Sequence, residues 1–441
     1  MVKYPVQREI DRYVARTPKS KRLHEEASRY LPGGISRAAH YFDPHPIYAD
    51  HGQGHYVYDV DGNRYLDFGN NATSLILGHA HPDVVEAMQR AVDRGYSFSN
   101  PVEAQIRLAK LLCDRIPSMD TVRFTNSGTE ATLNTIRAAR AFTGKHKIAK
   151  FEGAYLGSHE YASVSFRIPP DQLNPDGPTV IHDMPGQPPS LLEDVIVLRY
   201  NNLEECERII RGNKDDLSCV IMEPVASVLG HTPGKPEFLR GIRELTRELG
   251  IILIFDEVQS ARIAPGGAQE LLGVVPDMTA LGKTVGGGTP AGAFGGREDI
   301  MALFDPTGGA PTVLHAGTFN ANPVTMAAGE ATLSRLTPPV YERLAQMGES
   351  LRGKLRAVLD EFEIPNQVTG IASLFGLHFT ANEITDHRSS LNSDGELRRG
   401  LTVGLMNEGV FLGSSMNVLT GDAEVDTLVD AVRRVIQRLR S

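Results

Sequence analysis

Asp256 is a carboxylate in an unusual setting. It directly follows the apolar run IILIF at 251–255, a pattern that predicts a buried strand. The carboxyl ends of such strands are where α/β sheets place their ligands, and a carboxylate buried there needs a cationic partner. A protonated ring nitrogen of a bound cofactor is one such partner. The alternative is a strand-end aspartate that caps the next helix.

Lys283 follows another apolar segment, PDMTALG, and precedes a glycine-rich loop. Removal from water lowers the pKa of such a lysine and leaves its amine able to form a Schiff base with a carbonyl. The sequence Gly282-Lys283-Thr284 ends like a P-loop, but the first glycine of that motif would fall at position 277, which is Asp277. A nucleotide-binding P-loop is therefore excluded.

The stretch TVRFTNSGTEAT at 121–132 could bind phosphate. TVRFT predicts a strand, and Ser127, Gly128 and Thr129 stand just before a helical pattern. Backbone amides at a helix N-terminus bind phosphate, and a glycine there lets the chain approach closely. A capping box between Ser127 and Glu130 is the alternative. Thr318, in HAGTFNANP, is a further hydroxyl candidate.

The elements that must position these residues form a repeating pattern. Short apolar runs such as LSCVIM at 217–222 alternate with helical stripes such as that of 238–249, which indicates a mostly parallel sheet covered on both faces. The turn Asp61-Gly62 between YVYDV and RYLDF predicts a hairpin, and an apolar stripe at 425–439 predicts a C-terminal helix. We predict three segments: 1–70 and 326–441 in a small domain, and 71–325 in a large cofactor-binding domain.

Composition excludes several classes of function. The 441 residues carry a net charge of -9 without a dense basic run, which argues against a nucleic-acid partner. The three cysteines are far apart, and His51, His55, His79 and His81 lack zinc-motif spacing, so we expect no metal site. The polar N-terminus is not a secretory signal, and no apolar run approaches the roughly 20 residues of a membrane helix. We therefore expect a cytoplasmic protein.

Taken in order, the motifs resemble those of a known family. YDVDGNRYLDF, LGHAHP, RFTNSGTEAT, KFEGAYLGSH, IMEPV, FDEV, LGKTVGGGTPAGAFGGRED and GTFNANP resemble the class III pyridoxal-phosphate aminotransferases. Within them the chain is similar to the branch of glutamate-1-semialdehyde aminomutase and β-phenylalanine aminotransferase. The resemblance runs from about Pro32 through the C-terminal helix. It implies pyridoxal 5′-phosphate as cofactor and fold type I, with a mostly parallel seven-stranded sheet and a small α+β domain built from both termini.

The resemblance implies a role for each residue around the cofactor ring. Lys283 would form the Schiff base and then move the proton during catalysis. Asp256 would pair with the pyridine nitrogen. Tyr155 and Val258 would cover the two faces of the ring, and Glu223 would lie on its hydroxyl side.

It also implies how the phosphate is held. Gly128 and Thr129, with Ser127, would bind it in one subunit. Thr318 would reach the phosphate of the neighbouring subunit, which implies a homodimer with shared active sites.

Several positions separate this chain from the aminomutase. Leu156 replaces a histidine, ISRAA at 35–39 replaces a Ser-Pro-Val-Arg stretch, and GVFLGSSMNVLTGD replaces a longer C-terminal loop. Arg37, by contrast, stands where the β-phenylalanine enzyme has an arginine. Its guanidinium could bind a substrate carboxylate in a bidentate manner; the alternative is a surface pair with Asp43 or Asp50.

We therefore predict an aminotransferase that moves an amino group from an amino acid, preferably an aromatic or aliphatic β-amino acid, to a keto acid. The first alternative is an isomerase of the aminomutase type. A second is a D-amino acid aminotransferase or lactam racemase on the same scaffold. A degenerate regulatory protein is a third, against which the intact Lys283, Asp256 and Thr129 argue.

Overall fold

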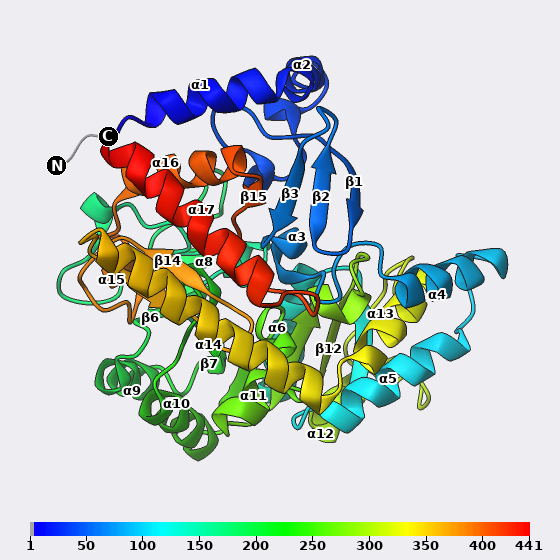
Figure 1. The fold of residues 1–441 in the computed structure, drawn as a ribbon. Coiled ribbons are helices and arrows are strands. Elements are labelled where there is room, and N and C mark those ends of the chain that lie inside the picture. Colours follow the sequence, from blue (N-terminus) through cyan, green and yellow to red (C-terminus); the bar gives the residue numbers. More distant parts are fainter. Residues whose placement is uncertain (1–3) are drawn as a thin grey trace.

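A seven-stranded sheet lies at the centre of the computed structural model, which describes residues 4–441 (Figure 1). Its strands are buried along most of their length, so both faces are covered, as predicted. All are parallel except β12, which runs antiparallel to both of its neighbours. The order is β4 (Thr121–Thr125), β12 (Gly292–Gly296), β11 (Met278–Gly282), β10 (Ile252–Asp256), β7 (Leu217–Met222), β5 (Lys147–Phe151) and β6 (Val195–Leu198).

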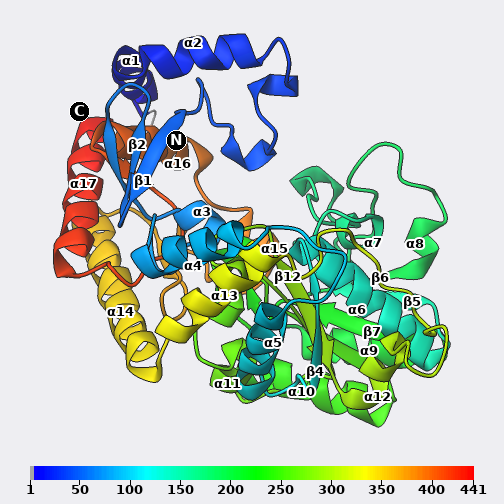
Figure 2. The ribbon, with the colours of Figure 1, turned by 90° about the vertical axis from the view of Figure 1, so that its right-hand side faces the viewer.

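Helices cover this sheet on both sides (Figure 2). The predicted apolar face of α10 is buried through Phe238, Leu239, Ile242 and Leu245. The longer helices of this region are α4 (Pro82–Asp93), α5 (Glu103–Arg115), α6 (Gly128–Thr143), α9 (Leu203–Gly212), α10 (Pro236–Glu248) and α13 (Pro323–Arg335). Its shorter ones are α7 (Glu160–Ser163), α8 (Leu191–Asp194), α11 (Gly267–Leu272) and α12 (Glu298–Met301).

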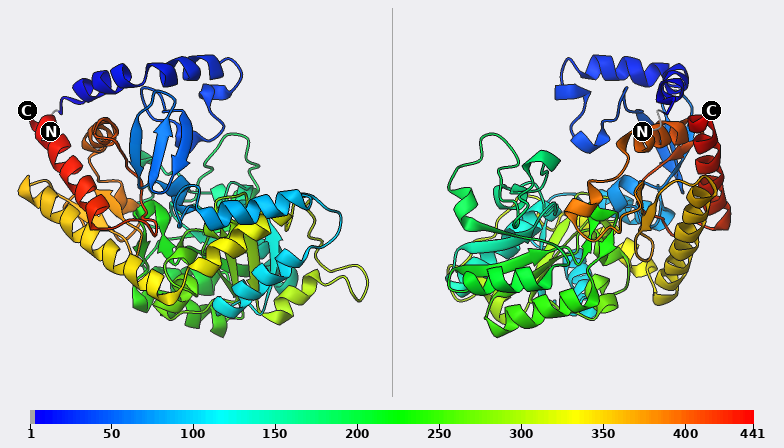
Figure 3. Two further views of the ribbon diagram at one scale, coloured as in Figure 1. Left: turned by 45° about the vertical axis from the view of Figure 1, so that its right-hand side comes forward. Right: turned by 90° about the vertical axis from the view of Figure 1, so that its left-hand side faces the viewer.

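A second core is built from the two ends of the chain. Its buried residues come from positions 6–68 and 351–439, and α1 (Val6–Arg16), α16 (Gly395–Asn407) and α17 (Asp422–Arg440) lie side by side (Figures 1 and 3). The sheet here has the order β1 (Ala49–Gln53), β2 (Tyr56–Asp59), β3 (Arg64–Asp67) and β15 (Val410–Phe411). The hairpin β2–β3 and the C-terminal helix are confirmed.

The remaining elements lie outside the two larger sheets. They are α2 (Pro18–Ala27), α3 (Asn70–Thr73), α14 (Pro338–Glu361), α15 (His387–Ser390) and the two-stranded sheets β8 (Val225–Ala226) with β9 (Thr232–Pro233) and β13 (Gln367–Thr369) with β14 (Gly376–His378). Of these, α14 adds Leu351, Leu355, Val358 and Leu359 to the second core. The boundary predicted at 325/326 falls within α13, which packs against α4 and α5. The division into 1–70, 71–325 and 326–441 stays a prediction. No helix within residues 4–441 is both long and apolar enough to cross a membrane.

Candidate active site

Three neighbouring parallel strands end in ionisable residues at one edge of the central sheet. Glu223 follows β7, Asp256 is the last residue of β10, and Lys283 follows β11. Because β10 lies between β7 and β11 and pairs in parallel with both, the three side chains begin at the same edge. Strand β10 spans 252–256 rather than 251–255, so Asp256 closes the strand instead of following it. The sequence had predicted that Asp256 and Lys283 both lie at the carboxyl ends of strands, and the structure places them there.

Asp256 is buried, and among residues 4–441 no cation forms an ion pair with it. Only 7% of it is exposed, and its Oδ1 accepts a hydrogen bond from the backbone N–H of Val258 at 2.9 Å. Burial raises its pKa to about 6, against the hydrogen bond from Val258 and the charge of Lys283. A carboxylate in this state gains stability from any bound cation that reaches it.

Lys283 adopts a left-handed backbone conformation, with φ of 50°, as the chain turns from β11 into a short 3-10 turn at Lys283–Gly286. Burial lowers the pKa of its amine, Asp256 and Glu223 oppose that change, and the positive charge of Arg37 adds to it. A larger fraction of the amine is therefore uncharged at neutral pH than in a surface lysine. The uncharged form is the one that attacks carbonyl carbons.

Glu223, at the end of the neighbouring strand β7, has one carboxyl oxygen without a hydrogen-bond partner among the described residues. Its Oε1 accepts from the backbone N–H of Ser227 at 3.3 Å, whereas its Oε2 is buried without a partner among the described residues. Burial, followed by the nearby charge of Asp256, raises its pKa to about 8. Near neutral pH this carboxyl is mostly protonated and can donate a hydrogen bond to an oxygen placed beside it.

The predicted phosphate residues begin helix α6. Ser127 is its N-cap, with Oγ accepting from the backbone N–H of Glu130 at 3.2 Å. The Glu130 carboxylate accepts from the backbone of Asn126 at 2.8 Å, not from Ser127, so only half of the alternative capping box forms. Gly128 and Thr129 thus open a sixteen-residue helix, and Gly128 lies close to Gly282, the residue before Lys283.

Gly128 allows a close approach between this helix and the loop after β10. A methyl group at position 128 would lie 2.7 Å from Cγ2 of Val258, and one at Gly282 would lie 3.1 Å from its Cγ1. Val258 therefore packs between the start of α6 and the end of β11. This packing brings the predicted phosphate residues and the predicted ring contact into one place.

Tyr155 lies on the loop that follows β5. It is 40% exposed, and its ring centre lies 5.3 Å from that of Phe166. The next residue, Leu156, is only 1% exposed, and its carbonyl accepts from Thr132 Oγ1 at 2.8 Å. The leucine at this departure from the aminomutase pattern is thus a packed core residue, while Tyr155 stays accessible to a ligand.

A buried lysine, Lys150, binds three backbone carbonyls of the segment that contains Tyr155. Lys150 is fully buried in β5, and its ammonium donates to the carbonyls of Ala154 at 3.2 Å, Ala162 at 2.6 Å and Val164 at 2.5 Å. Burial lowers its pKa to about 7. The three carbonyls fix the path of the chain around Tyr155.

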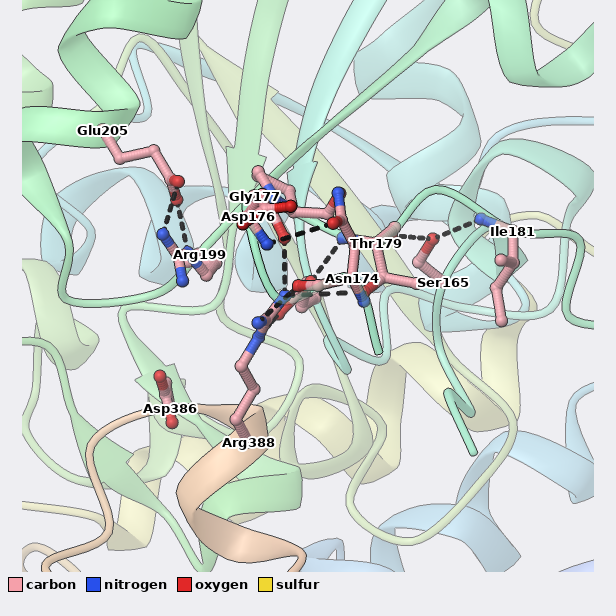
Figure 4. Close-up of polar contacts among 12 residues, drawn as sticks. Ser165, Asn174, Asp176, Gly177, Thr179, Ile181, Arg199, Glu205, Asp386 and Arg388 are labelled. Carbon is pink, nitrogen blue, oxygen red and sulfur yellow. Dashed lines mark hydrogen bonds and ion pairs between the residues drawn. The ribbon is translucent and has the colours of Figure 1, made fainter. Parts of the chain in front are cut away.

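An arginine from the C-terminal part of the chain, Arg388, binds both the start of this loop and the segment 174–179; Figure 4 shows its contacts with that segment. Arg388 of α15 donates to both carboxylate oxygens of Glu152, at 2.9 and 2.8 Å. It also donates to the carbonyls of Asn174 at 2.8 Å and Gly177 at 2.7 Å. The loop that carries Tyr155 is therefore tied to the C-terminal segment by a bidentate, largely buried ion pair.

Arg37 lies close enough to Lys283 for its charge to lower the pKa of that amine. It is exposed, and its Nη1 donates to Oδ1 of Asn71 at 2.8 Å. The alternative pairings do not form, because Asp43 pairs with Arg399 and Asp50 with His51.

Thr318 lies on a loop that contacts the residue before Ser127, because Asn126 Nδ2 donates to Oδ1 of Asn320 at 2.9 Å. Thr318 is exposed, and within residues 4–441 no hydrogen bond of its side chain is found. Its role at a neighbouring subunit stays a prediction. The histidines named above have other partners: His79, for example, lies 2.7 Å from Asp67.

Sequence reasoning missed the residues that hold the site together. Lys150 and Glu152 stand in the motif KFEGAYLGSH, but nothing in that motif indicates what they bind, and Arg388, the partner of Glu152, lies 236 positions away. Arg262 was also missed. It is 1% exposed, with no carboxylate partner within the described residues, and it donates to the carbonyl of Thr73 at 2.6 Å. A charged residue inside the otherwise small and apolar stretch at 260–264 was the only available signal.

Comparison with known proteins gives consistent matches over nearly the whole chain. A family model described as aminotransferase class-III matches residues 38–430. The glutamate-1-semialdehyde 2,1-aminomutase of Methanothermobacter thermautotrophicus is 40% identical over 430 residues, covering 96% of this chain and 100% of that protein. A solved ω-transaminase from Sphaerobacter thermophilus is 44% identical with a TM-score of 0.94, covering 97% of this chain and 100% of that one. The β-phenylalanine aminotransferase of Variovorax paradoxus is 36% identical with a TM-score of 0.88, covering 98% and 97%.

Proposed function

Because the chain belongs to the class III aminotransferase family, we propose that it moves an amino group from a carboxylate-bearing amine to a keto acid. The family and its transaminase relatives make it a pyridoxal-phosphate-dependent enzyme of the aminotransferase type. The finer assignment, to a β-amino acid donor, is our proposal. The observation that carries it is Arg37, an exposed guanidinium that is bound to Asn71, has no carboxylate partner among the described residues, and lowers the pKa of Lys283 through its charge.

The side chains at the sheet edge fit pyridoxal 5′-phosphate. When bound, this cofactor supplies an aldehyde that accepts the amino group and a ring that stabilises negative charge at the substrate carbon. Asp256, buried with a raised pKa, suits a protonated ring nitrogen. Glu223, with its unpartnered and mostly protonated Oε2, suits the ring hydroxyl side. Ser127, Gly128 and Thr129 would hold the phosphate at the start of α6.

Lys283 would then act in two ways. Its amine would hold the cofactor through the aldehyde carbon before the substrate arrives. Once displaced, the uncharged Nζ would take the proton from the substrate carbon and return it during transfer. The lowered pKa favours the uncharged form that this step requires. Tyr155, on the loop held by Lys150 and Arg388, would cover one face of the ring.

Arg37 would select the donor. A guanidinium binds a carboxylate through two parallel hydrogen bonds. In a β-amino acid an extra carbon separates the carboxylate from the carbon that carries the amino group. The carboxylate therefore lies farther from the reacting carbon, where the guanidinium of Arg37, on the N-terminal segment, would bind it. The β-phenylalanine aminotransferase and the ω-transaminase among the relatives support this assignment.

An isomerase is the second candidate. The curated relative at 40% identity is an aminomutase, so the curated relatives support this alternative better than they support a β-amino acid donor. Leu156, packed in the core where the aminomutase has a histidine, argues the other way.

A donor panel separates the candidates. We expect β-phenylalanine with pyruvate or 2-oxoglutarate to give keto-acid-dependent amino transfer. Conversion of glutamate-1-semialdehyde without a keto acid would instead establish the isomerase. The matched control donor is 1-phenylethylamine, which keeps the phenyl and amino groups of β-phenylalanine and lacks its carboxylate.

The variant Arg37→Ala tests the carboxylate contact directly. A hydrogen bond to a charged group contributes about 1.5–3 kcal/mol, so kcat/KM for β-phenylalanine should fall about 10- to 150-fold. The value for 1-phenylethylamine should change little. Equal losses for both donors would mean that Arg37 supports only the fold.

We also propose a homodimer. Tyr96, Phe98, Ile106, Leu314 and Phe319 are 50–72% exposed. A groove of about 830 Å³ between α4, α5 and α13 is lined in part by Phe98. Exposed apolar groups of this kind are typical of subunit interfaces. Sedimentation at assay concentration should give a dimer, and a fully active monomer would contradict the shared site at Thr318.

A further inference from the structure

The chain forms a left-handed turn next to Arg37. Four consecutive residues, Asn70, Asn71, Ala72 and Thr73, have φ values of 47°, 46°, 53° and 74°. Asn71 and Ala72 also have ψ values of 62° and 50°, which place them in the left-handed helical region. This region is unfavourable for L residues, least so for asparagine, and a β-branched residue rarely enters it. Strain of this kind persists only where the surroundings impose it.

The two ends of the turn are buried and held by side chains from distant parts of the chain. Asn70 is fully buried; its Nδ2 donates to the carbonyl of Ser415 at 2.9 Å, and its Oδ1 accepts from Asn417 at 2.8 Å. Thr73 is 2% exposed, and its carbonyl accepts from Arg262 Nη1 at 2.6 Å. Arg262 also donates to the carbonyl of Met416, so it joins the turn to the C-terminal loop.

The middle of the turn is exposed and presents a single polar group. Asn71 and Ala72 both face solvent, and the Asn71 Oδ1 accepts from Arg37 Nη1 at 2.8 Å. The partner of Arg37 is therefore a neutral amide. A carboxylate at this place would compensate the charge of Arg37 and compete with a substrate carboxylate for its N–H groups.

We propose that Asn71 is a positioning residue that sets the specificity of the site through Arg37. The anchored left-handed turn fixes its Oδ1, and this oxygen holds one arm of the guanidinium. The other N–H groups of Arg37 stay available to the donor's carboxylate with their charge intact. The inference deepens the proposed function and rests on it.

Substitutions in the turn separate positioning from a structural role. Glycine accepts a positive φ more readily than any other residue, so Asn71→Gly removes the amide without straining the backbone. Aspartate also tolerates this conformation, so Asn71→Asp keeps an oxygen acceptor but neutralises Arg37. The matched control is Ala72→Gly, which relaxes the turn one residue further along and keeps the amide.

The assay uses the holoenzyme with β-phenylalanine or 1-phenylethylamine as donor and pyruvate as acceptor. For β-phenylalanine we expect Asn71→Gly to raise KM about 3- to 10-fold and to change kcat little. Asn71→Asp should raise KM at least as much. Ala72→Gly should match the wild type, and 1-phenylethylamine should be affected by none of the three.

The double variant Arg37→Ala/Asn71→Gly completes the test. If Asn71 acts through Arg37, the double variant should equal Arg37→Ala alone, because the effects of coupled residues are not additive. Two results would overturn the inference while leaving the proposed function intact. One is wild-type KM in Asn71→Asp, and the other is an additive loss in the double variant. If Arg37→Ala itself fails to distinguish the two donors, the proposed function fails, and the inference falls with it.

Discussion

Neutralising Asp256 should stabilise the protein when its cofactor has been removed. Burial raises the pKa of this carboxyl to about 6, and it is only 7% exposed. Since a tenfold change in proton affinity corresponds to about 1.4 kcal/mol, holding the carboxylate in this environment costs about 3 kcal/mol above pH 6. Asp256→Asn should therefore raise the melting temperature of the cofactor-free chain at pH 8 by about 3 °C for 441 residues.

The pH dependence has a defined sign. Below about pH 4, the pKa of this carboxyl in the unfolded chain, Asp256 is protonated in both the folded and the unfolded state. Its raised pKa then has no effect on the free energy of unfolding. The destabilisation grows as pH rises from about 4 to 6 and is then constant. The advantage of Asp256→Asn should therefore be absent below about pH 4, about half of its full value at pH 5 and complete at pH 8.

Asp277 provides a matched control, because it is a buried carboxylate that, unlike Asp256, is paired with arginines and has a lowered pKa. It is 4% exposed and accepts from Arg243 at 2.7 and 3.0 Å and from Arg297 at 3.1 Å. Burial opposes these contacts, but the hydrogen bonds led by Arg243 lower its pKa below the ordinary value. Asp277→Asn should therefore destabilise the chain at pH 8, by about 3–5 kcal/mol, since it breaks a buried ion pair.

Thermal unfolding of both variants with and without pyridoxal 5′-phosphate is the measurement. In Asp256→Asn the stabilisation gained on adding the cofactor should shrink, and turnover should fall sharply, because the ring nitrogen has lost its partner. Shifts of the same sign in Asp256→Asn and Asp277→Asn at pH 8, without cofactor, would refute the reasoning. So would near-normal turnover in a well-folded Asp256→Asn.

Three further substitutions test other parts of the site. Lys283→Ala should abolish both turnover and the visible absorption of the lysine-linked cofactor, and a purified variant that keeps either would refute its role. Gly128→Ala would place a methyl group 2.7 Å from Val258 Cγ2. Such overpacking costs about 1–3 kcal/mol, so a titration should show cofactor binding weakened about 5- to 150-fold. An unchanged Kd would contradict this expectation. Arg388→Ala leaves the Glu152 carboxylate buried without its cation, so denaturant unfolding should show a loss of about 3–5 kcal/mol, and unaltered stability would mean that the pair is not a clamp.

The sequence predicted the parts of the molecule that local patterns specify. Apolar runs and helical stripes predicted the parallel sheet, because a strand buried on both faces must be apolar throughout. Position at the strand ends then predicted that Asp256 and Lys283 share an edge of the sheet. Ser127–Thr129 could be placed at a helix start because the cap is a local signal.

The remainder depends on contacts between distant segments. Glu152 stands in the motif KFEGAYLGSH, but its partner Arg388 lies 236 positions away, so the sequence did not indicate that the two side chains pair. The left-handed turn is imposed by Arg262 and by the C-terminal loop, so no propensity of residues 70–73 predicts it. The capping alternative at Ser127 was half right, because the Glu130 side chain reaches Asn126 instead.

The core built from both ends of the chain has a consequence for biosynthesis. Residues 6–68 leave the ribosome first, but most of the core they join comes from residues 351–439. At translation rates of about 5–20 residues per second, the N-terminal segment waits roughly 15 s to 1 min for its partners. During that time Tyr13, Tyr65 and Phe68, each 1% exposed in the finished molecule, remain uncovered. The central sheet, which lies between the two ends in sequence, can therefore form before the second core closes.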